Sequence, residues 1–227
     1  GEVEVTNEYG RPILLGAVMA LVVVVAFGAW AVLSGQFGTP QDVDHVVVVL
    51  VTPDEEGVQL PQAMALYQMG TAGIEATPID VDLEVTLAGS SYTRLRDAYP
   101  FGGGDLRVAT WGESAGAYST ERIVVTHGVW SELAMDDEIT LDMPVDSEVF
   151  DGSALYSFEE GVAAYSGDEI VALLKGVDYF EAGDRSTVRA QVSEELARLL
   201  SAHGGDVSVR TSLPDDLLST WLVRLGS

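Results

Sequence analysis

Three cationic side chains lie close together in a chain that is otherwise strongly acidic. Lys175 is the only lysine, and Arg185 and Arg189 follow it closely. The chain carries 11 Lys and Arg residues against 36 Asp and Glu residues, which gives a formal net charge of -25 at pH 7. Arg185 and Arg189 are four residues apart, so on a helix they share one face. Such a pair can hold an anion, or it can simply pair with acidic neighbours such as Glu181 and Asp184.

A second candidate for chemistry is a nucleophilic serine. The segment GESAG, residues 112–116, matches the G-x-S-x-G pattern, and Ser114, Asp184 and His203 follow in the chain order of a hydrolase triad. The surrounding sequence disfavours a serine esterase, because the motif must join a strand to a long helix and few residues separate Gly116 from the next predicted strand. The alternative is a helix that ends at Gly116. The esterase is therefore the less favoured alternative function.

The composition excludes several other classes of function. The acidic excess argues against nucleic-acid binding, which needs a basic surface to meet the phosphates. The chain has no cysteine, which excludes disulfides, a thiol nucleophile and a cysteine-bound metal. His45, His127 and His203 are scattered, and no metal-binding spacing links them. The acidity by itself fits solubility in a salty or alkaline medium.

Residues 12–33 form an apolar run without a charged residue. A helix needs about 20 such residues to cross a bilayer, and the run is longer than the core of a signal peptide. We therefore expect one transmembrane helix, with cleavage at Ala-Trp-Ala, residues 29–31, as the alternative. Arg11 flanks the run, so the positive-inside rule places residues 1–11 in the cytoplasm as the end of a longer tail. Residues 34–44 then form a linker, and residues 45–227 form a domain outside the cytoplasm, anchored in the cell membrane.

The domain after the linker mixes strands with helices. Its first strand is a β-branched run of the buried type, and the next two flank a Gly-Thr-Ala-Gly turn that predicts a hairpin. Strands are predicted at 45–52, 63–69, 74–79, 83–89, 121–127 and 138–145. Helices are predicted within 102–116, at 167–176 ending at Gly176, over 184–203, and after Pro214. This mixture favours a layered α/β domain.

The clearest helix runs over residues 184–203. Its apolar residues recur at helical spacing, at Val188, Val192, Leu196, Leu199 and Leu200. Asp184 or Ser186 is expected to cap its start, and Gly204 and Gly205 to stop it. The pair of arginines then lies near the N-terminus of the helix, which itself favours anions.

Five segments match, in order, the pattern of one protein family. The first contains Pro78, Asp80, Gly89, Arg94, Ala98, Tyr99, Gly102, Gly103 and Leu106. The others are residues 136–145, 161–175, 183–191 and 209–218. Together these segments resemble the LytR-CpsA-Psr family. A single N-terminal membrane helix followed by an outer domain is also the plan of that family.

The resemblance implies a three-layer α/β/α domain with a central mixed sheet. Members of the family transfer glycopolymers from a polyprenyl-pyrophosphate carrier to cell-wall peptidoglycan. Arginines hold the pyrophosphate, carboxylates hold Mg²⁺, and an apolar pocket holds the lipid. The resemblance therefore implies a membrane-anchored protein that binds such a glycan carrier, with peptidoglycan as the acceptor and glycopolymer phosphotransferase as the enzyme class.

The resemblance also assigns roles to individual residues. Phosphoryl transfer needs cations around the negative charge that is spread over the phosphate oxygens. The planar guanidinium of arginine suits this role because it can donate two hydrogen bonds to a phosphate. The implied residues are Arg189, Arg185 and Lys175 for catalysis, Arg94 and Gln191 for the substrate, and Asp80 for Mg²⁺. Arg94 and Arg96 alternate along the chain, so one of the two is expected to face solvent.

The sequence departs from the family pattern at several positions of the site. Ile79 stands where the family has an arginine, and Ser186 and Ala190 replace an arginine and a glutamine. The position of the first metal-binding aspartate falls on Asp44 or, with better strand spacing, on Gln62. These departures suggest a degenerate active site. They motivate the alternative function, a non-catalytic envelope scaffold or lipid-carrier binding module.

Overall fold

The structure is a computed structural model that describes residues 43–54, 56–71, 73–84, 91, 93–99 and 121–226. The expected transmembrane helix at 12–33 lies outside these residues, as do Ser114, its motif and the helix expected within 102–116. No helix among the described residues is long and apolar enough to cross a bilayer. Of the strand predicted at 83–89, only Leu83 and Glu84 are described.

A five-stranded mixed sheet forms the centre of the domain. Its strand order is β3-β2-β1-β4-β9, in which β1 and β4 run parallel and the other neighbours run antiparallel. The strands are β1 (His45–Pro53), β2 (Gln59–Met69), β3 (Ile74–Pro78), β4 (Arg122–Thr126) and β9 (Arg210–Thr211). The predicted α/β domain with a central mixed sheet is therefore confirmed, as is the hairpin of β2 and β3.

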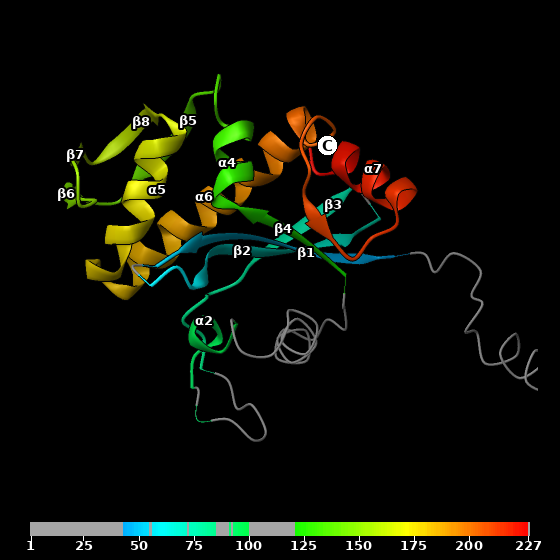
Figure 1. The fold of residues 1–227 in the computed structure, drawn as a ribbon, viewed down its shortest axis with the longest axis horizontal. Coiled ribbons are helices and arrows are strands. Elements are labelled where there is room, and N and C mark those ends of the chain that lie inside the picture. The colour runs from blue at the N-terminus through cyan, green and yellow to red at the C-terminus, as the bar shows by residue number, and fades with distance from the viewer. Residues whose placement is uncertain are drawn as a thin grey trace, which may run out of the picture. The chain divides into compact units, whose positions relative to one another are not determined.

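Strand β1 is buried on both faces of the sheet. Alternate residues point to opposite faces of a strand, and in β1 both sets are apolar. Val46, Val48 and Leu50 belong to the larger hydrophobic core, and Val47 and Val49 to a smaller one. Figure 1 shows α4, α5, α6 and α7 on one side of the sheet and α2 on the other.

The helices of the domain form where apolar residues recur at helical spacing in the sequence. They are α2 (Leu95–Ala98), α4 (His127–Leu133), α5 (Gly167–Gly176), α6 (Ala182–His203) and α7 (Asp215–Arg224). A single 3₁₀ turn, η2 (Val177–Tyr179), joins α5 to α6. The predicted stripe of α6 is buried in the larger core, and the helix predicted after Pro214 is confirmed as α7.

The predicted start of α6 is wrong by a few residues. The helix begins at Ala182, after an extended Glu181 whose side chain makes no capping hydrogen bond. Neither Asp184 nor Ser186 is the cap, because both already lie inside the helix. A side-chain cap occurs instead at α5, where Ser166 accepts from the backbone N–H of the third helical residue, Glu169, whose carboxylate accepts in return.

Two small antiparallel sheets complete the domain. They pair β5 (Ile139–Met143) with β8 (Gly161–Tyr165), and β6 (Ser147–Phe150) with β7 (Leu155–Phe158). Strand β6 packs against α5, where Val149 lies over Gly176. The end of α5 and its continuation η2 are thereby held beside β6.

Gly176 is required by this packing rather than by a left-handed turn. Its backbone is right-handed, but a Cβ atom there would lie 2.5 Å from Cγ2 of Val149. Because valine is stiff about χ1, it cannot easily move away. The glycine therefore lets α5 and β6 approach closely.

We expect Gly176→Ala to lower the free energy of unfolding by about 1–3 kcal/mol, because the added methyl overpacks the contact with Val149. Gly183→Ala is the matched control, because the residue is helical and a Cβ there would meet no described atom within 4 Å apart from its chain neighbours and its own helix backbone. The control should be neutral or stabilising by up to about 1 kcal/mol. Urea unfolding measures both. Equal losses in the two variants would contradict the packing argument.

Candidate active site

The guanidinium of Arg189 lies between two carboxylates from distant parts of the chain. Its Nη1 donates to Oδ2 of Asp82 at 2.6 Å, and its Nη2 donates to Oδ1 of Asp178 at 2.9 Å. The arginine side chain is only 3% exposed. A buried charge needs paired and hydrogen-bonded partners, so these two carboxylates are what allow Arg189 to be inside the protein.

Two further arginines join the same carboxylates. Arg96 donates through Nη1 to both oxygens of Asp178, at 2.8 and 2.7 Å, and its Nε is 3.7 Å from Oδ1 of Asp82. Nε of Arg185 is 3.3 Å from Oδ2 of Asp82. We call these five residues the arginine cluster. Three positive charges face two negative charges, which leaves one positive charge in excess.

Four different elements supply the arginine cluster. Asp82 is in the turn after β3, and Arg96 is in α2. Asp178 is in η2, and the other two arginines come from the first turns of α6. The spacing of four residues places Arg185 and Arg189 on one face, as predicted.

The arginines keep Asp82 ionised. Burial by itself would raise the pKa of Asp82, but the hydrogen bond and charge of Arg189, with the charges of Arg96 and Arg185, outweigh it and lower the pKa below its ordinary value of 3.8. Oδ1 of Asp82 and Nε of Arg189 still make no hydrogen bond in the described part of the chain. The cluster is therefore charged but not fully satisfied.

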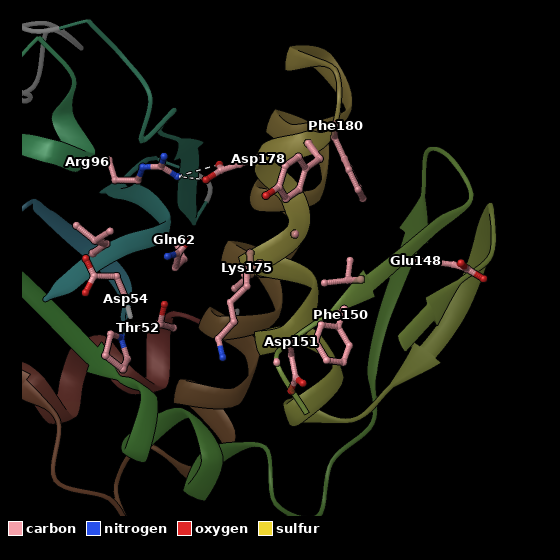
Figure 2. Close-up of a pocket in the computed structure, with 17 residues that line it drawn as sticks. Thr52, Asp54, Gln62, Arg96, Glu148, Phe150, Asp151, Lys175, Asp178 and Phe180 are labelled. Carbon is pink, nitrogen blue, oxygen red and sulfur yellow. Dashed lines mark hydrogen bonds and ion pairs between the residues drawn. The ribbon is translucent and has the colours of Figure 1, made fainter. Parts of the chain in front are cut away.

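An open cleft of about 830 Å³ lies beside the cluster. Figure 2 shows its lining between the end of β1 and start of β2 on one side and α5, η2 and β6 on the other. Arg96, Asp178 and Lys175 line it, whereas Arg185 and Arg189 are not among its lining residues. The structure thus separates Lys175 from the arginine pair with which the sequence groups it.

The lining combines polar groups with apolar rings. Its polar members include Thr52, Asp54, Gln62, Glu148 and Asp151, and its rings are Phe150, Tyr179 and Phe180. Hydrogen bonds from Ala154 and Ser153, together with the charge of nearby Lys175, lower the pKa of Asp151 to about 2. Gln62 is 8% exposed, and its Oε1 makes no hydrogen bond with the described residues. An acceptor is therefore left unused in the wall of the cleft.

The remaining predicted site residues make contacts with nearby backbone groups. Oδ1 of exposed Asp80 accepts the backbone N–H of Asp82. Gln191 holds the β5 backbone by donating to the carbonyl of Asp142 and accepting from its N–H. Arg94 is exposed and forms an isolated backbone bridge with Glu84. None of these contacts tests the roles that the family resemblance implies.

Sequence reasoning missed three members of the arginine cluster. Asp82 was passed over in favour of Asp80, and Arg96 in favour of Arg94, although the alternation of the two arginines already required a choice. Asp178 carried no signal at all. The suggestion that the α6 arginines pair with Glu181 or Asp184 is wrong, because their carboxylate partners are Asp82 and Asp178.

The described residues do not fit a metal ion held by the protein alone. No group of three or more His, Asp or Glu side chains among them could hold one. Asp82 faces three guanidinium groups, whose charge opposes a cation. Asp44, the other suggested ligand, is exposed at the start of β1, where its carbonyl accepts from Met69.

The hydrolase triad suggested by the sequence is excluded. Asp184 and His203 lie near opposite ends of α6, and a rise of 1.5 Å per residue separates them by roughly 28 Å. His203 pairs instead with Asp137, at 3.0 Å. Ser114 lies outside the described residues, but no serine can use these two residues together.

We expect Asp82→Asn to lower the free energy of unfolding at pH 7 by roughly 3 kcal/mol, because buried Arg189 loses a charged partner. The folded-state pKa of Asp82 is lowered, so its contribution is present above pH 3.8 and is lost as the pH falls through the folded-state value. The difference from the native chain should therefore shrink in acid. Urea unfolding at pH 7 and pH 3 tests this, with exposed Asp80→Asn as the control. A loss that stays constant between the two pH values would contradict it.

The fold is similar to that of several solved structures, although no family model and no curated protein matches the sequence. TagV of B. subtilis superposes with a TM-score of 0.60 at 15% identity, over 82% of this chain and 81% of that chain. TagT bound to LI-WTA superposes with a TM-score of 0.57 at 17% identity, over 81% of this chain and 75% of that chain. Protein gbs0355 from Streptococcus agalactiae gives a TM-score of 0.60 at 13% identity, over 82% of this chain and 75% of that chain. TagV and TagT are LytR-CpsA-Psr proteins, so the domain has the fold of structures from that family.

Proposed function

We propose that this chain is a membrane-anchored, extracytoplasmic protein that binds a polyprenyl-pyrophosphate-linked glycopolymer in the cleft beside the arginine cluster. The observation that carries the proposal is the convergence of Arg96, Arg185 and Arg189 next to an open cleft in a protein of net charge -25. The fold supports it, because TagT of the same fold has been solved bound to LI-WTA and LIIa-WTA.

The cleft supplies the chemistry that such a ligand requires. Arg96 and Lys175 are cations on its walls, and charge-assisted hydrogen bonds to phosphate oxygens are among the strongest in proteins. Phe150, Tyr179 and Phe180 offer apolar rings, and Gln62 adds an uncharged polar side chain to the wall. A ligand that joins a pyrophosphate to a sugar and an apolar chain uses all three kinds of group.

Transfer of the glycopolymer to peptidoglycan is part of the proposal, as a glycopolymer phosphotransferase reaction. In that reaction a hydroxyl group of peptidoglycan would attack the phosphorus that carries the glycan, the P–O–P bridge would break, and the prenyl phosphate would leave. The cationic residues would stabilise the negative charge of the two phosphates as the bridge breaks. Asp80 is the predicted ligand of Mg²⁺, but only if the pyrophosphate supplies further oxygens to the ion. Binding is therefore tested with and without Mg²⁺.

A second function, a non-catalytic lipid-carrier binding module, is favoured by two observations. Gln62, one of two candidates for the first metal-binding aspartate, is a neutral amide in the cleft wall. Ile79 is 5% exposed and packs in the smaller core, where the family has an arginine. Restoring arginine at position 79 would put a charge into that core, so it is not a clean test. An assay of the unmodified chain with a lipid-linked glycan distinguishes the two functions instead. Binding without turnover would identify a binding module.

We expect Lys175→Gln to weaken binding of a long-chain prenyl pyrophosphate roughly tenfold, the scale of one charge-assisted hydrogen bond. Arg198→Gln is the charge-matched control, because Arg198 is exposed and pairs with Asp137 and Glu195 away from the cleft. Calorimetric titration of the full chain in detergent micelles, with and without Mg²⁺, measures both. Equal weakening in the two variants would indicate only a general charge effect. No binding by the native chain under either condition would overturn the proposed function.

A further inference from the structure

Asp178 lies between the cleft and the buried part of the arginine cluster. It lines the cleft, and its side chain is 39% exposed there. Both of its oxygens accept from Nη1 of Arg96, at 2.8 and 2.7 Å, and Oδ1 also accepts from Nη2 of Arg189, at 2.9 Å. Figure 2 shows Asp178 facing Arg96 across the upper end of the cleft. One carboxylate therefore occupies nitrogens of two guanidinium groups.

Both terminal nitrogens of Arg189 already donate to carboxylates, and the side chain is buried away from the cleft. Its Nη1 is taken by Asp82 at 2.6 Å and its Nη2 by Asp178, and its side chain is 3% exposed. Arg189 does not line the cleft, whereas Asp178 does. An anion that enters the cleft beside Arg96 therefore also meets the carboxylate of Asp178, which already accepts from Nη1 of Arg96 and Nη2 of Arg189.

This arrangement imposes an electrostatic cost on small anions. A phosphate beside Arg96 would lie near a like charge, and displacing Asp178 means breaking three charge-assisted hydrogen bonds. A single phosphate has few oxygens with which to replace them. A pyrophosphate has two linked phosphates and therefore more oxygens with which to replace them, and Arg96 and Lys175 both line the cleft that would receive it.

We propose that Asp178 is a specificity-determining residue that competes with the ligand for Arg96 and Arg189. Its carboxylate excludes singly phosphorylated anions and leaves the cleft open to ligands with two linked phosphates. This inference rests on the proposed function, since it assumes that the anion binds beside Arg96. The residue that decides which anionic ligands bind in the cleft would then belong to η2, the single turn between α5 and α6.

The test compares inorganic phosphate, inorganic pyrophosphate and farnesyl pyrophosphate by calorimetric titration of the full chain. Asp178→Asn keeps the shape but removes the charge, and it should raise the affinity for phosphate at least about tenfold and reduce the preference for pyrophosphate. Asp178→Glu keeps the charge and should retain the preference. Asp137→Asn is the control, because it frees Arg198 and His203 outside the cleft with the same change in net charge.

The outcomes separate this inference from the proposed function. If Asp178→Asn binds phosphate no better than the native chain while both bind farnesyl pyrophosphate, Asp178 is only a structural tie, and the inference is overturned while the function stands. If neither chain binds any of the probes, both are overturned. If the variant does not fold, the inference is tested by the melting temperature of the native chain with phosphate and with pyrophosphate. Stabilisation by pyrophosphate but not by equal phosphate supports the inference, and equal stabilisation by both overturns it.

Discussion

The buried guanidinium of Arg189 is the group to which the rest of the site is fitted. Its two carboxylate partners come from the turn after β3, far away in sequence, and from η2, just before α6. Removing one partner of a buried ion pair leaves an uncompensated charge and costs several kcal/mol. The turn after β3, η2 and α6 therefore have one mutual arrangement in which that charge is satisfied. The apolar stripe of α6 holds the helix on the sheet, and Arg189 fixes which part of it meets Asp82.

The same network explains how a strongly acidic protein can keep an anion site. Acidic residues across the surface repel an anionic ligand at long range, but salt screens that repulsion beyond roughly 10 Å. The arginine cluster beside the cleft carries three arginines against two aspartates. The lining of the cleft holds Arg96 and Lys175 against four carboxylates, so an anion is attracted only at the cationic positions. Partial neutralisation by Asp82 and Asp178 lets three arginines be packed together without strong mutual repulsion. It also makes the site selective, because a ligand must compete with carboxylates that are already in place.

Part of the candidate site could be predicted from the sequence, and the failures have physical reasons. The spacing of Arg185 and Arg189 gave their shared helical face directly, because helix geometry is local. Asp82 was missed because it lies in one turn with Asp80, and only the path of the chain decides which carboxylate points towards the arginines. Arg96 was missed for the same reason. Lys175 lies close to the arginine pair in the sequence, but α5 and η2 direct it to the cleft instead.

The sequence by itself determined the elements of this domain: the β-branched run of β1, the hairpin of β2 and β3, and the stripe of α6. These follow from periodicity and turn residues, which act between neighbours along the chain. The tertiary structure alone decided which carboxylate meets which guanidinium. Arg189 and Asp82 are 107 residues apart, and an ion pair has no sequence period that could reveal such a contact. It also decided that Asp178 stands at the cleft, because that position depends on how closely Gly176 lets α5 approach Val149.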